Sequence, residues 1–227
     1  MRVMSCVGGR ARSGMRPIAA IVLALTVVAC AVAPVAAREL LDRVIAVVSG
    51  TVITLSDARA AISFGLVDTK GEKDPIAIAM QWLVDRQLVL DEVNRYEFGD
   101  PSAEQFEAVY AEVTKRLSAG GTPVAALASL GFNKDGAKRF VRDTIRVQQF
   151  LQRRFESVQP GTEDELRTFY TANAARFAKD GKALTFDQAR PAVEQTFEAV
   201  RRVQTIDAYL ARLRRRTDVN ELYVPMR

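Results

Sequence analysis

Beyond residue 40, apolar residues fall mostly into helical stripes, with short β-branched runs near both ends of that stretch. In Leu41–Thr54 a β-branched run is interrupted by Ser49-Gly50, which predicts a β-hairpin. Because two strands alone are only marginally stable, the hairpin needs a third strand or a helix beneath it. The strand-like segment Val219–Val224 can supply that third strand. The pattern predicts a mainly α fold whose small sheet joins an N-terminal hairpin to a C-terminal strand.

Capping residues mark the predicted helix starts. Ser56-Asp57 is expected to cap a short helix that ends near Gly65, and Asp68–Asp74 is expected to be a loop. Pro75 suits the first position of a long apolar helix that runs to about Phe98. The remaining helices are expected to begin at Ser102, Thr122, Asn133, Thr162 and Thr185, and Ser102 and Thr162 open capping boxes.

Glycine and proline mark the predicted interruptions. Gly120-Gly121 and Gln159-Pro160-Gly161 are expected to separate helices, and Lys179–Lys182 is expected to be a tight loop. Pro191 lies in the early turns of the last helix, where it removes one hydrogen bond and predicts a bend. Since segments from both ends share the predicted sheet, we expect one structural unit rather than two.

The first 37 residues have the order of features of a secretory signal peptide. A basic stretch ending at Arg16 precedes the apolar run Ile18–Val32, and Val35-Ala36-Ala37 offers small side chains for cleavage after Ala37. Met15 is an alternative start to Met1, because it would give a more compact signal. A core helix should have a polar and an apolar face, and this run does not. An uncleaved membrane anchor needs about 20 apolar residues, and Ile18–Ala37 reaches that length only by including Pro34. A cleaved signal, and therefore a periplasmic protein, is favoured over both.

A lipoprotein is the alternative to a freely released periplasmic protein. Val27-Val28-Ala29-Cys30 fits a loose lipidation motif, in which Cys30 would carry the lipid and become the first residue. Cys6 and Cys30 are the only cysteines, so the processed chain would contain no disulfide. The working domain is then 38–227, with a core over 38–157 and C-terminal helices and closing strand over 162–227.

The positive net charge of +5 belongs to the leader. Without the four arginines of the first sixteen residues, 28 basic side chains face 27 acidic ones, so nucleic acid is not an expected partner. Contact with a membrane is expected only through the signal or a lipid on Cys30. The basic run Arg212, Arg214-Arg215-Arg216 is interpreted as a solvated helix end, where arginines also suit the helix dipole.

The composition removes most catalytic chemistry. The chain has no histidine, and its cysteines fall in or beside the leader, so the usual general base and thiol nucleophiles are missing. No phosphate-binding loop or metal motif is present, and no cofactor is expected. Composition alone leaves serine–lysine and paired-carboxylate catalysis open, but Glu163-Asp164-Glu165 is better explained as a helix start. The sequence predicts a protein that is not an enzyme, with no catalytic, cofactor or metal residues to assign.

Three segments resemble the N-terminal chaperone domain of the SurA-type periplasmic chaperones, a relative of the trigger-factor peptide-binding fold. They are Leu41–Asp57, Trp82–Glu92 and Gly131–Arg146. Glu163–Phe177 and Thr185–Leu222 resemble the helices and strand that flank the parvulin isomerase domain of such proteins. Where isomerase-bearing relatives insert that domain, this chain has only Ala178–Ala183, so the resemblance does not imply isomerase activity.

The resemblance implies an ATP-independent holdase for unfolded secreted or outer-membrane proteins. Such a site needs exposed apolar surface and adaptable contacts rather than fixed reactive groups. Phe64, Phe98 and Phe132 lie near element ends and are candidates for this surface, but core packing is the favoured interpretation for each of them. Trp82 is expected in the core. The alternative function is a lipid-anchored or periplasmic accessory protein that binds one folded partner.

Overall fold

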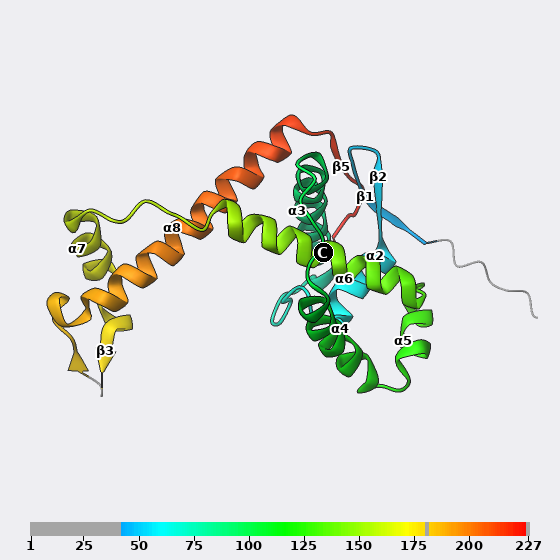
Figure 1. Ribbon diagram of the computed structural model, residues 1–227, viewed down its shortest axis with the longest axis horizontal. Helices are drawn as coiled ribbons and strands as arrows, with labels where there is room; N and C mark the ends of the chain where they lie inside the picture. The colour runs from blue at the N-terminus through cyan, green and yellow to red at the C-terminus, as the bar shows by residue number, and fades with distance from the viewer. Residues whose placement is uncertain (1–41, 180–181, 226–227) are drawn as a thin grey trace, which may run out of the picture. The chain divides into compact units, whose positions relative to one another are not determined.

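The computed structural model describes residues 42–179 and 182–225. The predicted signal peptide, the cleavage after Ala37 and the lipidation of Cys30 lie outside the described residues. Residues Leu41–Arg227 form one compact unit. The unit is mainly helical with a small three-stranded antiparallel sheet, which confirms the predicted fold class (Figure 1).

The sheet joins segments from opposite ends of the unit, as predicted. Its strand order is β2-β1-β5, with β1 at Val44–Val48, β2 at Thr51–Thr54 and β5 at Val219–Glu221. Ser49 and Gly50 both have positive φ, 48° and 80°, as a tight two-residue hairpin turn requires. On its other side β1 pairs with β5, and the strand is shorter than the predicted segment that runs to residue 224.

Within the described residues, seven helices surround the sheet or extend from it, and the sequence predicts each of them. They are α2 (Leu55–Ser63), α3 (Pro75–Arg95), α4 (Ala103–Ser118), α5 (Pro123–Ser129), α6 (Lys134–Arg154), α7 (Glu163–Ala172) and α8 (Phe186–Arg216). A 3-10 turn, η1 (Ala174–Phe177), and a two-stranded hairpin, β3 (Ala178–Lys179) with β4 (Lys182–Ala183), connect α7 to α8.

Most of the predicted caps are confirmed. Ser102, Thr162 and Thr185 each open a capping box, and the Asn133 side chain accepts a hydrogen bond from the Gly136 amide. The predicted cap of α2 is wrong, because its N-cap is Thr54 rather than Ser56-Asp57.

The reason lies in the spacing of the α2 cap. The Asp57 amide donates to the Thr54 hydroxyl at 3.2 Å, and the Thr54 amide donates to the Asp57 carboxylate at 2.8 Å. This reciprocal pair needs its two members three positions apart, and Thr54 is the residue three positions before Asp57. The last residue of β2 therefore starts α2 directly.

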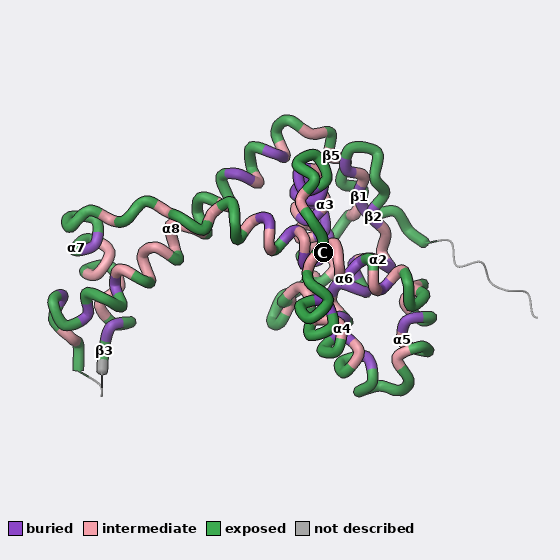
Figure 2. The backbone as a smooth tube through the Cα atoms, in the orientation of Figure 1, coloured by how far each residue is buried: buried purple, intermediate pink, exposed green. Residues whose placement is uncertain are grey.

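The main hydrophobic core lies between the sheet, helices α2 to α6 and the C-terminal end of α8. Figure 2 shows the buried residues concentrated along α3, α6 and β1. Phe64 is 1% exposed and meets Phe132 and Phe140 edge-to-face, with ring centroids 6.0 and 5.9 Å away. Trp82 is half-buried and packs against this core.

A second, smaller cluster joins α7, η1 and the N-terminal part of α8. Its buried members are Leu166, Phe177, Phe186, Ala189 and Val193. Gly161 enters this cluster at a close approach: a β-carbon there would lie 2.7 Å from the Phe197 ring and 2.9 Å from Leu166. Any larger residue at this position would therefore force the Phe197 ring or the Leu166 side chain to move.

Helix α8 contributes to both clusters. Figure 1 shows it as one unbroken helix, and it continues through Pro191. Val193 belongs to the second cluster, whereas Tyr209 and Leu213 belong to the first. The predicted division at 157/162 therefore separates α7 from the main core but does not separate the C-terminal end of α8 from it. The bend at Pro191 stays a prediction.

Candidate functional site

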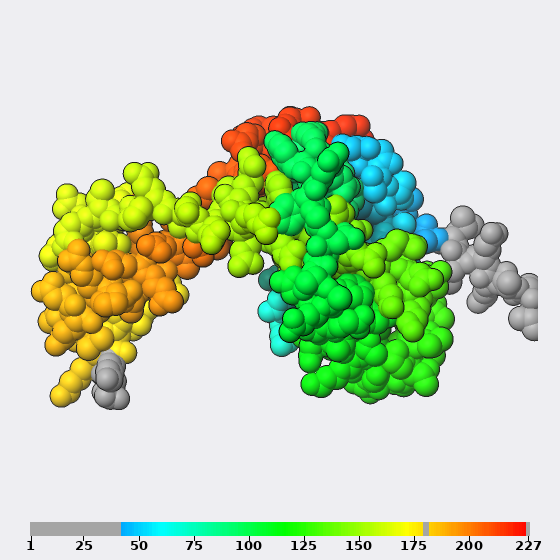
Figure 3. Space-filling model, in the orientation of Figure 1, coloured from blue at the N-terminus to red at the C-terminus, as the bar shows by residue number. Residues whose placement is uncertain are grey.

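Helices α4 and α6 run antiparallel and contact each other, and α5 contacts both of them. We call the surface along this contact the α4–α6 seam; it consists of two pockets and a row of aromatic rings covered by cations. Figure 3 shows side chains of α4 and α5 forming a continuous surface on the viewed face. The three cation–ring pairs are Arg153 over Phe98 (5.0 Å), Arg142 over Phe106 (5.5 Å) and Lys138 over Tyr110 (5.7 Å).

One end of the seam holds an apolar pocket of about 240 Å³ between α4, α5 and α6. Its lining residues are Tyr110, Val113, Thr114, Leu117, Pro123, Val124, Leu127, Lys134 and Ala137. Val113 and Leu127 are buried and form its inner wall, whereas Val124 is 75% exposed at its rim. An exposed β-branched side chain beside an open apolar pocket can receive an apolar group from a partner.

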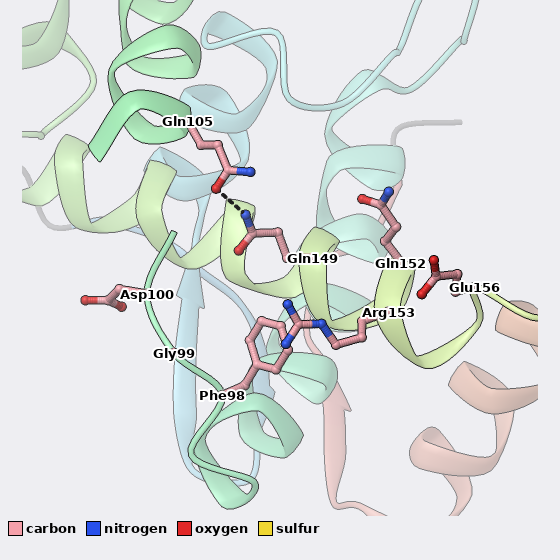
Figure 4. Close-up of a pocket in the computed structure, with 8 residues that line it drawn as sticks. All are labelled: Phe98, Gly99, Asp100, Gln105, Gln149, Gln152, Arg153 and Glu156. Carbon is pink, nitrogen blue, oxygen red and sulfur yellow. Dashed lines mark hydrogen bonds between the residues drawn. The ribbon is translucent and has the colours of Figure 1, made fainter. Parts of the chain in front are cut away.

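The opposite end of the seam holds a polar pocket of about 440 Å³, which we call the carboxamide pocket. Figure 4 shows its lining residues: Phe98, Gly99, Asp100, Gln105, Gln149, Gln152, Arg153 and Glu156.

The three glutamines of this pocket come from two helices. Gln149 donates to the Gln105 side-chain oxygen at 2.9 Å, and that same oxygen also accepts from the Ser102 amide in the α4 cap. Among the described residues, no hydrogen bond uses the Gln149 oxygen, the Gln105 nitrogen or the Gln152 carboxamide. Carboxamides with an unused donor and acceptor match the amide groups of an extended main chain.

Arg146 fixes the turn that carries Phe98 into the carboxamide pocket. Its guanidinium donates to the Asn94 side chain at 3.1 Å and to the Phe98 carbonyl at 3.0 Å. Its Nε atom lies 3.4 Å from an Asp100 carboxylate oxygen. The turn after α3 is thus held to α6 by one side chain, so the Phe98 ring is presented in a fixed position.

The three cation–ring pairs of the seam are individually weak. A cation held over an aromatic face is worth about 0.5–1 kcal/mol at exposed sites, so each pair can open at a small cost.

Burial raises the pKa of the Tyr110 hydroxyl, and the neighbouring charges of Glu107 and Asp135 raise that pKa further. Tyr110 therefore stays neutral at physiological pH and presents its ring to the apolar pocket.

The structure separates the three phenylalanines proposed for an apolar surface. Phe98 lines the carboxamide pocket and is half-buried. Phe64 is in the core, which agrees with the favoured interpretation of core packing; Phe132 is half-buried and packs on Phe64. Phe64 is the C-cap residue of α2, and its ring is buried against Phe132 and against Phe140 of α6.

Two members of the basic run at the end of α8 also pair with carboxylates of α3, in addition to lying at a partly solvated helix end. Arg214 pairs with Asp85 of α3 at 2.8 Å, and Arg216 pairs with Glu92 of α3 at 2.6 Å. Glu92 is only 4% exposed, and its carboxylate also accepts hydrogen bonds from Arg95 and from the Tyr209 hydroxyl. These arginines therefore dock α8 on α3.

The acidic run at the start of α7 is explained as predicted. Glu165 completes the capping box with Thr162 and pairs with Arg201 at 2.7 Å. Glu163 pairs with Arg167 and Arg190. The hydrogen bond from the Thr162 amide is the main cause that lowers the pKa of Glu165, and Arg201 lowers that pKa further.

Sequence reasoning did not find the glutamines or Val124. The available signal was weak: Gln149 and Gln152 lie one helical turn apart near the end of a predicted amphipathic helix, but which partner faces them depends on the fold. Val124 lies next to a predicted helix start, and the sequence does not show which residues of other helices lie beside it. Both features depend on how α4, α5 and α6 pack.

Within residues 42–179 and 182–225, no group of histidine, cysteine or acidic residues is arranged to hold a metal ion. Over the same residues, none of the helices combines the length and apolar character that crossing a membrane needs. Comparison of the chain with known protein families gives no match, and comparison with curated proteins gives none.

Proposed function

We propose that this protein is an ATP-independent periplasmic holdase of the SurA type without isomerase activity. It binds unfolded segments of secreted or outer-membrane proteins along the α4–α6 seam and releases them without hydrolysing ATP or changing a covalent bond. The proposal is supported by the leader-like N-terminus, by the order of elements that resembles SurA-type chaperones, and by the surface that the seam offers.

The observation that carries the proposal is the presence of two complementary pockets on one seam. The apolar pocket can accept a side chain, and the carboxamide pocket can satisfy main-chain amides that an unfolded segment exposes. An unfolded chain carries both kinds of group in every segment, whereas a small-molecule ligand would need only one enclosed pocket. Weak, repeated contacts of this kind suit binding of many sequences.

Aggregation protection tests the proposal directly. The full chain is expressed with its own leader and purified, and two unrelated unfolded clients, one of them an outer-membrane barrel, are diluted out of denaturant in its presence. We expect light scattering to fall for both clients at near-stoichiometric ratios. Protection of neither client, together with co-purification of one folded protein, would instead support the accessory-protein alternative.

A pair of valine variants assigns protection to the seam. Val124→Glu places a charge at the rim of the apolar pocket, and Val203→Glu places the same charge on α8, where Val203 is 58% exposed. We expect Val124→Glu to weaken client affinity about tenfold, which corresponds to about 1.4 kcal/mol, and Val203→Glu to leave affinity unchanged. Equal protection by both variants would remove the seam from the proposal.

A further inference from the structure

A third pocket lies away from the seam, between α3, α6 and α8. Its volume is about 180 Å³, and its walls are mostly apolar. The apolar lining residues are Trp82, Val89, Val147, Leu151 and Leu210. Arg86 and Thr144 also line it and are buried, whereas Trp82, Leu151 and Leu210 are half-buried. The pocket therefore has mostly apolar walls and a buried guanidinium, with the half-buried Asp85 and the exposed Gln148 also in its lining.

The Arg86 guanidinium is held firmly but is not fully paired. Its Nε donates to the Thr144 hydroxyl at 2.9 Å, and its Nη2 donates to the Phe140 carbonyl at 3.0 Å. The ring of Phe140 lies 4.5 Å below the guanidinium carbon. Among the described residues, no hydrogen bond uses the Arg86 Nη1 atom.

The carboxylates near Arg86 are engaged elsewhere. Asp143 is 3.9 Å from the Arg86 Nη2 and is shared with Arg146 at 3.7 Å. Asp85, which also lines the pocket, is paired with Arg214 at 2.8 Å. Burial lowers the pKa of Arg86, with Asp143 and Asp57 opposing that effect. A buried cation whose nearest carboxylate lies 3.9 Å away and is shared with a second arginine can accept a further anion.

The size of the pocket restricts the anion. A cavity of about 150 Å³ holds one benzene ring, so 180 Å³ accommodates one side chain of leucine or phenylalanine size. A long acyl chain does not fit this volume. An aspartate or glutamate within a chain carries its charge without an apolar group beside it, and would leave the apolar walls uncovered. Only the last residue of a chain places an α-carboxylate and an apolar side chain side by side, ahead of the main chain.

We propose that the Trp82–Arg86 pocket binds the C-terminal residue of an unfolded polypeptide whose last side chain is apolar. The α-carboxylate accepts a charge-assisted hydrogen bond from Arg86, and the side chain packs against Trp82, Leu151 and Leu210. This inference rests on the proposed function, because it gives the holdase a site for the free end of its client. It is separate from the α4–α6 seam, so the two can fail independently.

Trp82 provides the readout, because it is the only tryptophan of the chain and lines the pocket. The full chain is titrated with a short peptide that ends in leucine with a free carboxylate, and with the same peptide amidated at that end. We expect a saturable change in Trp82 emission with the free acid and at least about tenfold weaker binding of the amide, since one charge-assisted pair is lost. Calorimetry alongside detects binding that leaves the emission unchanged.

Variants separate the pocket from the rest of the surface. Arg86→Gln removes the charge; because it can also destabilise the α3–α6 contact, Leu210→Glu is the second variant and places a carboxylate within the pocket itself. The matched control is Leu222→Glu, at a residue 52% exposed and outside the pocket. We expect Leu210→Glu to abolish binding of the free-acid peptide and Leu222→Glu to keep it, with both variants retaining the circular dichroism of the parent.

Three outcomes overturn the inference: equal affinity of acid and amide peptides, no binding of either by calorimetry, or tighter binding of octanoate than of the leucine peptide. The last result would show a site for free carboxylic acids rather than for chain ends. None of these outcomes depends on aggregation protection. A holdase that protects clients through Val124 but does not distinguish the two peptides would retain the proposed function and lose this site.

Discussion

Leu213 in the last turns of α8 provides the sharpest test of how the C-terminal segment joins the main core. Leu213 is 2% exposed and belongs to the cluster formed by the hairpin and α3. Replacing it by alanine removes three buried carbon atoms without changing the helix or any charge. The effect of Leu213→Ala on stability therefore measures this packing alone.

The expected magnitude follows from the atoms that are removed. At about 0.8 kcal/mol per buried carbon, the lost transfer free energy is about 2.4 kcal/mol. The cavity left behind raises the total loss to about 3 kcal/mol, within the range of buried leucine-to-alanine changes. For a protein of this length each kcal/mol lowers Tm by about 2–4 °C, so Leu213→Ala should lower Tm by about 6–12 °C.

Two probes and one control make the measurement specific. Thermal and urea unfolding are followed by circular dichroism and by Trp82 fluorescence, because Trp82 reports on the main core. The control is Val203→Ala in the same helix; Val203 is 58% exposed, and its substitution should change stability by less than about 0.5 kcal/mol.

The packing of α8 would be refuted by equal transitions for Leu213→Ala and Val203→Ala. It would also be refuted if Leu213→Ala shifted only the circular dichroism transition and left the Trp82 transition in place. In that case α8 would unfold without the core on which the structure places it.

Three further changes test other contacts. Gly161→Ala should destabilise the α7–α8 cluster by about 1–3 kcal/mol in urea unfolding, because its β-carbon has no room, whereas Gly120→Ala, in open space, should be nearly neutral. Glu165→Gln tests a pH effect: since the folded pKa of Glu165 lies below its ordinary value of 4.5, the carboxylate stabilises the fold above that value, and this contribution is lost as pH falls through the lowered pKa. The stability difference between parent and Glu165→Gln should therefore shrink from pH 7 to acid, and a constant difference would contradict it. Burial and the charge of Glu92 raise the pKa of Tyr209, so Glu92→Gln should lower that pKa in an ultraviolet titration and cost about 2 kcal/mol of stability; an unchanged tyrosine titration would argue against their contact.

Local chemistry made the helix starts predictable from the sequence. Ser102, Thr162 and Thr185 each bond to a residue three positions ahead, so all the information lies within one turn. The error at α2 arose because two candidate caps, Thr54 and Ser56, lie two residues apart. Only the pairing of Thr54 with Asp57 decides between them, and Thr54 also reads as a strand residue.

Contacts between distant segments were not predictable in the same way. The arginines at the end of α8 suit the local helix dipole, so the sequence offered a sufficient explanation without partners. Their actual partners, Asp85 and Glu92, lie more than a hundred positions earlier, on one face of α3. The carboxamide pocket has the same origin, because Gln105 and Gln149 meet only after α4 and α6 pack antiparallel.

The position of β1 in the middle of the sheet has a consequence for biosynthesis. One neighbour of β1 follows it almost at once in the chain, but the other, β5, is synthesised after all seven helices of the described residues. Until β5 emerges, the backbone edge of β1 that faces it has no strand partner. Pairing residue 46 with residue 221 requires closure of nearly the whole unit, the kind of contact that forms slowly. The sheet is therefore expected to be completed only after translation of β5, and a ribosome-stalled chain lacking β5 should remain sensitive to protease.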